Sequence, residues 1–127
     1  MDLQLKDKVV IVTGGSKGVG FGICEQLIQE GALPVIVGRN KATIPQAGKN
    51  LEASGGKVGY AYAELTDPEA CKSAVKKIEK EYGTIDGLVN NAGINDGVSL
   101  EKGDFDAFTQ SIHRNLTHYF MMAHYCL

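Results

Sequence analysis

Near its start the chain contains Lys8-Val-Val-Ile-Val-Thr13, followed directly by Gly14-Gly-Ser-Lys-Gly-Val-Gly20. The short β-branched run predicts a strand that is buried on both faces. After Gly18 the apolar residues recur at spacings of three and four, which predicts a helix, and Gly31 is placed to end it. A strand, a glycine loop and a helix in this order form the first half of a nucleotide-binding α/β unit.

The rest of the chain repeats this alternation. Further strands are predicted at residues 33–38, 57–64 and 85–90, and further helices at residues 44–53, 66–82 and 105–123. Strands that alternate with helices pair in parallel through right-handed crossovers. We therefore expect a single α/β domain, a Rossmann-type doubly wound parallel sheet with strand order 3-2-1-4. The apolar spacing that predicts the last helix is carried by Phe105, Phe108, Ile112, Leu116, Phe120 and Ala123.

Two features predict that this domain is truncated before its remaining strands. The fourth strand would lie at an edge of the sheet, yet residues 88–90 carry no charge or proline of the kind that protects exposed edges. The last helix also runs to Leu127 without a capping glycine. We therefore expect residues 1–127 to be the nucleotide-binding N-terminal part of a larger domain whose catalytic C-terminal part is absent.

Composition excludes several classes of function. The 127 residues carry a net charge of −2 and are 43% hydrophobic, without a block of like charges, so we expect neither a nucleic-acid nor a membrane partner. Neither a signal peptide nor an apolar run of membrane-spanning length is recognisable. Cys24, Cys71 and Cys126 lack metal-ligand spacing, which favours free thiols in a cytoplasmic protein and no metal site.

The glycine loop predicts a phosphate site. Gly14 would permit a tight turn, Gly18 a close approach of backbone to a pyrophosphate, and Gly20 close packing of the helix. Amide groups at a helix N-terminus, together with the helix dipole, favour a bound phosphate. A plain glycine-rich turn remains the alternative for this motif taken alone. The residues predicted to bind a dinucleotide here are Gly14, Ser16, Lys17, Gly18, Val19 and Gly20.

Three motifs together resemble the short-chain dehydrogenase/reductase family. They are Thr13-Gly-x-x-x-Gly-x-Gly20, Asn90-Asn-Ala-Gly93 and Asn115, in the family's order on the expected elements, and the resemblance covers all 127 residues. It implies an NAD(P)-dependent oxidoreductase in which Asn91, Ala92 and Gly93 line the cofactor ribose. It also implies that Glu64 and Leu65, where the family usually has an aspartate and a small apolar residue, face the adenine.

The same resemblance gives Asn115 a catalytic role, that of holding a proton-relay water. Each asparagine also has a structural interpretation. Asn90 and Asn91 could be turn-formers, and Asn115 could be a buried amide held by hydrogen bonds. We favour the family role because the upstream motifs are in register.

Two basic residues favour NADP over NAD. Arg39 stands where an NAD-preferring member would carry an acidic residue, and Lys17 precedes Gly18. Two cations that converge there would make charge-assisted bonds to a 2′-phosphate. The alternative is ordinary solvated surface charge.

The family's tyrosine and lysine, spaced Tyr-x-x-x-Lys, are missing. None of the five tyrosines has a lysine four residues later, and the family places that pair, and a serine, beyond residue 127. In the family the tyrosine passes the proton while hydride moves. We therefore expect these 127 residues to be inactive alone. A non-catalytic nucleotide-binding or regulatory module is the alternative, which a downstream Tyr-x-x-x-Lys would exclude.

A closer resemblance is to the sugar-oxidising branch, in particular the L-fucose dehydrogenases. It rests on residues 1–14, residues 95–116 and the stretches around His118 and His124. The resemblance implies a small-molecule substrate, a sugar such as L-fucose, and a parent protein that forms homo-oligomers. Asn95 and Asp96 could bind sugar hydroxyls or could simply be turn residues at a loop tip.

Overall fold

A computed structural model describes all residues, 1–127. Its four strands form one parallel sheet in the order β3-β2-β1-β4, which confirms the predicted topology. The strands are β1 (Val9–Thr13), β2 (Leu33–Gly38), β3 (Gly59–Tyr62) and β4 (Gly87–Val89). The helices are α1 (Gly18–Gln29), α2 (Thr43–Glu52), α3 (Pro68–Tyr82), α4 (Phe105–Ile112) and α5 (His118–Cys126), with a π-helical turn η1 (His113–Thr117) before α5.

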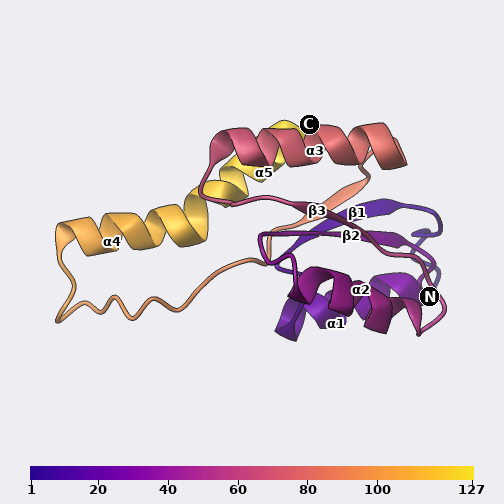
Figure 1. Cartoon of the computed structure of the whole chain (residues 1–127), viewed down its shortest axis with the longest axis horizontal. Coiled ribbons are helices and arrows are strands. Elements are labelled where there is room, and N and C mark those ends of the chain that lie inside the picture. The colour runs from indigo at the N-terminus through magenta and orange to yellow at the C-terminus, as the bar shows by residue number, and fades with distance from the viewer.

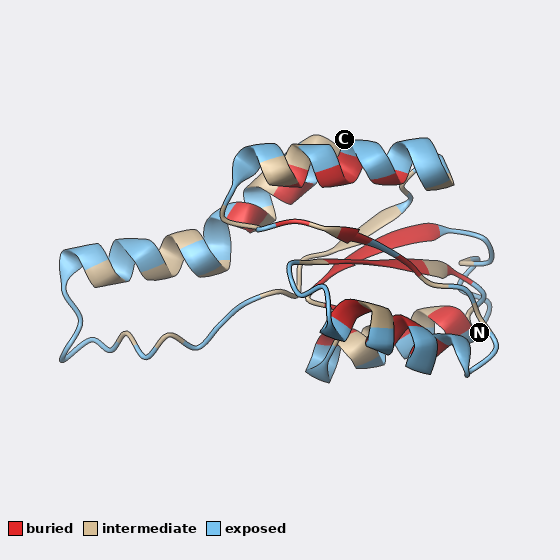
Figure 2. Cartoon of the chain, in the orientation of Figure 1, coloured by how far each residue is buried: buried red, intermediate tan, exposed pale blue.

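The sheet is the middle of three layers. Figure 1 shows α1 and α2 on one face and α3 and α5 on the other. Successive residues of a strand point to opposite faces, so Ile11 packs toward α3 and α5 while Val10 and Val12 pack toward α1 and α2. The buried residues line the inner surfaces of these layers (Figure 2). The near-continuous apolar strands of the sequence are explained by this burial on two faces.

Local signals in the sequence agree with the helix ends. The Asp67 carboxylate accepts hydrogen bonds from the backbone N–H groups of Glu69 and Ala70 at the start of α3, 3.0 and 3.4 Å long, as an N-cap residue does. Gly31 follows α1 with a φ of +80°, a left-handed conformation that glycine adopts without strain.

β3 and β4 are shorter than predicted. Beyond the assigned end of β3, Ala63 still donates a hydrogen bond to the Gly38 carbonyl. The parallel pairing with β2 therefore continues past Tyr62, and the last residue of a strand is defined only to within one or two positions. Before β4, the Asp86 carboxylate accepts a hydrogen bond from the Val9 N–H at 2.8 Å. A side chain there takes the place of a backbone partner, which shortens the regular ladder.

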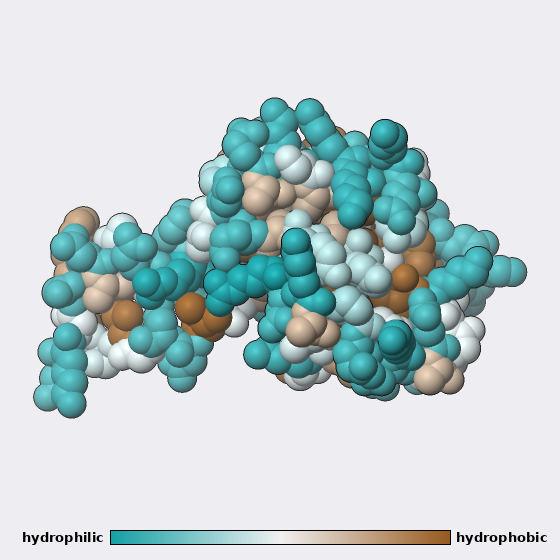
Figure 3. Space-filling model, in the orientation of Figure 1, coloured by the Kyte–Doolittle hydropathy of each residue, from teal (hydrophilic) through white to brown (hydrophobic).

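The last helix differs most from expectation, because it is interrupted. The π-helical turn adds a residue to the helical repeat and so shifts the phase of the apolar spacing. Instead of the predicted stripe, His118 and Met122 are the buried residues of α5. Phe105 and Phe120 are 80% and 70% exposed. α4 projects away from the sheet (Figure 1), and apolar groups are visible on that projection (Figure 3).

Candidate nucleotide-binding site

A cleft of about 890 Å³ lies at the carboxyl ends of the parallel strands. This is the edge at which open α/β sheets bind ligands, where the strand order reverses between β1 and β4. The sequence-predicted residues that line this cleft are Gly14, Ser16, Lys17, Gly18, Arg39, Glu64, Leu65, Asn91, Ala92 and Gly93. Segments from four separate loops are thus brought together around one cavity.

Thr13 and Asn91 join the end of β1 to the loop after β4. The Thr13 hydroxyl oxygen accepts hydrogen bonds from the N–H groups of Asn91 and Ala92, both 3.0 Å long. The Asn91 side-chain amide donates to the carbonyl oxygens of Thr13 and Gly14, at 3.0 and 3.2 Å. The Asn91 side chain therefore acts as a latch that holds the glycine loop against the loop after β4.

The glycines of the loop are required for different reasons. Gly14 and Gly18 have φ angles of +67° and +57°, which disfavour any residue with a Cβ. A Cβ on Gly18 would meet nothing within 4 Å, whereas one on Gly20 would lie 2.4 Å from the Gly14 carbonyl oxygen. Gly20 therefore allows α1 to pack closely against the loop that precedes it.

The N-terminus of α1 is available to an anion. Lys17 occupies the N-cap position, and no side chain caps the helix. The N–H groups of a first helical turn have no partner within their helix and carry the positive end of its dipole. Because Ser16, Lys17 and Gly18 all line the cleft, a phosphate there would satisfy these donors. The residues present fit a dinucleotide pyrophosphate.

Two charged residues that the sequence assigned to different parts of the cofactor form an ion pair. The Arg39 guanidinium Nη1 lies 3.0 Å from the Glu64 carboxylate Oε2. The hydrogen bond from Arg39 is the main reason that the pKa of Glu64 is lowered from its usual value, and the Thr66 side chain acts in the same direction. Glu64 is therefore a carboxylate at neutral pH.

Asn115 lies inside the π-helical turn, next to the cleft but not in its lining. Its side-chain oxygen accepts a 2.7 Å hydrogen bond from the Ile94 N–H, and its amide donates to the Ser111 carbonyl at 3.1 Å. A Cβ on Gly93 would lie 3.1 Å from the same side-chain oxygen. Asn115 thus fastens the loop after β4 to the last helix.

The cleft includes residues that sequence reasoning did not assign to the site, and omits others. Val19 is exposed outside it and Gly20 is buried beneath the loop. The lining residues that were missed include Asn40, Thr43, Thr66, Ile94, Arg114 and His118. Proximity in sequence could have indicated that some of them belong to the site. Asn40 follows Arg39, Arg114 precedes Asn115, and His118 comes three residues after Asn115.

His118 is the one buried histidine, with 1% of its surface exposed. Its Nε2 donates to the Arg114 carbonyl at 3.0 Å, and its Nδ1 has no partner. Burial lowers the pKa of His118 below its usual value, so the ring is neutral at pH 7. A proton on Nε2 leaves Nδ1 as the acceptor.

Asn95 and Asp96 both have hydrogen-bond partners within the chain. The Asn95 side-chain oxygen accepts a hydrogen bond from the Gly97 N–H at 3.2 Å, as in a turn. The Asp96 carboxylate accepts one from Ser111 at 3.1 Å and pairs with Arg114 at 3.4 Å. The Asn95 contact is that of a turn residue, whereas Asp96 joins its loop to α4 and η1.

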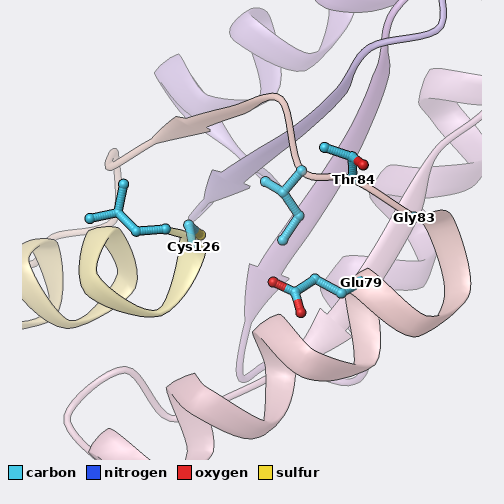
Figure 4. Close-up of a pocket in the computed structure, with 6 residues that line it drawn as sticks. Glu79, Gly83, Thr84 and Cys126 are labelled. Atoms are coloured by element: carbon cyan, nitrogen blue, oxygen red, sulfur yellow. The ribbon is translucent and has the colours of Figure 1, made fainter.

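A second cavity, of about 360 Å³, lies between the end of α3 and the end of α5 (Figure 4). Glu79, Gly83, Thr84 and Cys126 contribute to its lining. Burial, followed by the nearby Glu79 charge, raises the pKa of the Cys126 thiol, the opposite of what activates a nucleophilic cysteine. Burial likewise raises the pKa of Cys24 to about 12.

All three cysteines are free thiols. No group of three or more His, Cys, Asp or Glu side chains is arranged to hold a metal ion. None of the helices has both the length and the apolar character that a membrane span requires.

The parallel sheet, its helices on both faces and the cleft at its carboxyl edge are those of a Rossmann-type fold. A family model described as short chain dehydrogenase matches residues 8–127. The chain therefore belongs to the short-chain dehydrogenase family of oxidoreductases, as its motifs predicted.

Curated relatives with different substrates resemble the chain to a similar degree. It is 33% identical over 119 residues to a 3α-hydroxysteroid dehydrogenase of Mediterraneibacter gnavus, covering 92% of the chain and 48% of the relative. It is 37% identical over 117 residues to a 3-oxoacyl-acyl-carrier-protein reductase of Chlamydia muridarum, covering 91% and 47%. A gluconate 5-dehydrogenase of Gluconobacter oxydans is 39% identical over 92 residues, covering 72% and 36%. The chain spans about half the length of the first two relatives.

Solved structures also match nearly the whole of this chain with about half of their own length. The crystal structure of Cj0485 dehydrogenase superposes with a TM-score of 0.90 and 36% identity, covering 99% of this chain and 48% of the other. An L-sorbose reductase from Gluconobacter frateurii, complexed with NADPH and L-sorbose, superposes with a TM-score of 0.88 and 26% identity, covering 98% and 48%. Family membership does not identify the substrate, because these proteins act on steroids, acyl carriers and sugars.

Proposed function

We propose that this chain is the nucleotide-binding part of an NAD(P)-dependent oxidoreductase that oxidises a hydroxyl group or reduces a carbonyl group. One observation carries the proposal: the Asn91 latch holds the glycine loop so that the uncapped N-terminus of α1 opens into the cleft. The bound nicotinamide would supply the acceptor or donor of the hydride. The chain's own residues would bind and orient the dinucleotide.

In this proposal the pyrophosphate is held by residues 14–20, and the ribose and adenine by the ends of β2, β3 and β4. Asn91, Ala92 and Gly93 would line the ribose, and Leu65 would face the adenine ring. Val19 is the weakest member of the set, because its side chain is 75% exposed and lies outside the cleft lining. Its backbone N–H, in the first turn of α1, is the group that would contribute.

We further propose that Asn115 takes part in the proton relay. Its side-chain amide is already paired with Ile94 and Ser111. The amide oxygen keeps a second lone pair and the NH2 group a second proton, and either could hold a relay water. The remaining acid/base residues, Ser, Tyr and Lys in the family, would come from the part of the parent protein beyond residue 127.

NADP is the proposed preferred cofactor. The support is that Lys17 and Arg39 both line the cleft, and two cations suit a 2′-phosphate. Arg39→Asp in the intact protein should weaken NADP binding by about ten- to a hundredfold, because it removes a charge-assisted bond and adds repulsion. NAD binding should change little. Dissociation constants measured by titration test this, and equal constants for the two cofactors in the unmutated protein would contradict the preference.

We propose a sugar as the substrate, with L-fucose as the specific candidate. The resemblance around residues 95–124 supports this choice, as do similarities to a gluconate 5-dehydrogenase and to an L-sorbose reductase. The contacts of Asn95 and Asp96 provide no additional support, because both side chains have partners in the chain.

The intact protein should reduce NADP with L-fucose or a related pyranose, oxidising the anomeric hydroxyl to a lactone. A panel of aldoses, polyols, hydroxysteroids and 3-hydroxyacyl thioesters, followed at the absorbance of the reduced nicotinamide, tests this directly. Turnover confined to steroids or acyl thioesters would show that the sugar assignment is wrong, while leaving the oxidoreductase assignment intact.

We propose that the parent protein acts in the cytoplasm as a homo-oligomer. The three free thiols are those expected in a reducing compartment. The exposed side chains of Phe105, Phe108, Leu116 and Phe120 form an apolar surface along α4, η1 and α5, and apolar surfaces of this kind often mark subunit contacts.

A further inference from the structure

We propose that Glu64 is a specificity-determining residue: its carboxylate neutralises Arg39 and so holds the preference for a 2′-phosphate below the level that Lys17 and Arg39 alone would give. This inference rests on the proposed nucleotide-binding function and concerns the same cleft. It differs from the role implied by the family resemblance, in which Glu64 faces the adenine ring.

The geometry fixes Glu64 in the orientation that reaches Arg39. One carboxylate oxygen, Oε2, is 3.0 Å from the guanidinium Nη1, and the other, Oε1, accepts a hydrogen bond from the Thr66 hydroxyl at 3.1 Å. Both oxygens therefore have partners, and the side chain spans the gap between the ends of β2 and β3. An aspartate at this position would be one methylene shorter and would reach less far toward Arg39.

The other polar and charged groups nearby do not substitute for Arg39. The Asn40 side-chain oxygen accepts hydrogen bonds from the N–H groups of Ala42 and Thr43, at 2.9 and 3.0 Å. The Lys41 ammonium lies over the Tyr62 ring, 5.5 Å from its centroid. Of the basic residues that line the cleft, Lys17, Arg39 and Arg114, only Lys17 has no anionic partner. The positive charge offered to a phosphate is smaller than the sequence indicates.

The ionised Glu64 favours one form of the ribose over the other. A phosphate bound to the Arg39 guanidinium would lie near the carboxylate that is bound to the same group, and like charges repel across such a distance. A ribose 2′-hydroxyl carries no charge and can donate a hydrogen bond to a carboxylate. Glu64 should therefore weaken binding of the phosphorylated ribose and leave binding of the unphosphorylated one unchanged or slightly stronger.

Screening by solvent limits how far the Glu64 charge can change the preference for a 2′-phosphate. The Arg39 and Glu64 side chains are 73% and 44% exposed, and exposed ion pairs have small coupling energies. Removing the Glu64 charge should therefore change the ratio of affinities by about three- to fivefold.

The test measures adenosine 2′,5′-bisphosphate and adenosine 5′-monophosphate binding to the intact protein by calorimetric titration. Glu64→Gln should raise the affinity ratio, bisphosphate over monophosphate, by about three- to fivefold. Glu101→Gln removes the same charge from an exposed residue without an ion pair and should leave the ratio unchanged. In an Arg39→Gln background the effect of Glu64→Gln should become smaller, since the two residues act through one contact.

Glu64→Asp provides a second variant if Glu64→Gln is unstable, and it should raise the ratio by a smaller factor because the contact with Arg39 is weakened. An unchanged or lowered ratio in a folded Glu64 variant would overturn the inference. If Arg39→Asp lowers the ratio while both Glu64 variants leave it unchanged, the nucleotide site stands and only the role of Glu64 is wrong. If the unmutated protein binds neither nucleotide, the proposed function fails as well.

Discussion

Gly20→Ala is expected to weaken nucleotide binding strongly in the intact protein. The new Cβ would lie 2.4 Å from the Gly14 carbonyl oxygen and 2.5 Å from the Asn91 side-chain nitrogen. Both atoms belong to the latch that holds the glycine loop, so neither can move without breaking a hydrogen bond from Asn91 to the loop. Strain of about 1–3 kcal/mol is typical of such overpacking, which corresponds to a loss of affinity of about five- to 150-fold.

Gly22 provides the matched control on the same helix. Its Cβ would meet nothing within 4 Å, and replacing a glycine inside a helix with alanine is stabilising by about 0.5–1 kcal/mol. Gly22→Ala should therefore retain nucleotide affinity and unfold at a slightly higher temperature. Nucleotide titrations and thermal unfolding of both variants make the comparison. If Gly20→Ala binds as tightly as Gly22→Ala, the close packing of α1 on the loop is not what shapes the site.

The topology was predictable because its signals are local and agree with one another. The β-branched strands, the Asp67 cap and Gly31 each determine a short segment, and parallel pairing with right-handed crossovers leaves few arrangements of those segments. The same reasoning located the glycine loop and the ends of β2, β3 and β4 at one edge of the sheet. The cleft lining there includes ten of the residues that the sequence singled out, from Gly14 to Gly93.

Side-chain pairing across that edge was not predictable in the same way. Arg39 and Glu64 are 25 residues apart, and no periodicity connects them. Their contact depends on the twist of the sheet and on the length of a glutamate side chain. The sequence consequently assigned the two residues separately, one to a 2′-phosphate and the other to the adenine.

The interrupted last helix shows a second limit of what the apolar spacing in the sequence can predict. A spacing of three and four residues predicts a regular α-helix with one buried face, but Asn115 bonds to the Ile94 backbone and a π-helical turn surrounds it. This long-range contact decides which face of α5 is buried. It places His118 and Met122 inside and leaves Phe120 exposed, which the spacing alone could not indicate.

Residues 1–127, expressed alone, should show no measurable turnover with saturating cofactor and any alcohol or sugar. None of the five tyrosines is followed by a lysine four residues later. His118, the buried histidine beside the cleft, is held by the Arg114 carbonyl, and burial lowers its pKa, so it is poorly suited to donate a proton. General acid–base catalysis contributes about 10²–10⁴-fold to such reactions, and the chain lacks the family's groups for it.

Nucleotide binding should persist when turnover does not, because the glycine loop, the Asn91 latch and the Arg39–Glu64 pair all lie within these residues. Parallel assays of this chain and of the complete reading frame, with nucleotide titration, turnover and light scattering on each, make the comparison. The edge of β4 and the exposed apolar side chains of α4 and α5 should make the chain alone more prone to aggregate. If the chain alone reduces NADP with a sugar, a residue assigned here to structure must carry the proton. If the complete reading frame lacks a Tyr-x-x-x-Lys pair and also fails to turn over, a non-catalytic nucleotide-binding module becomes the better account.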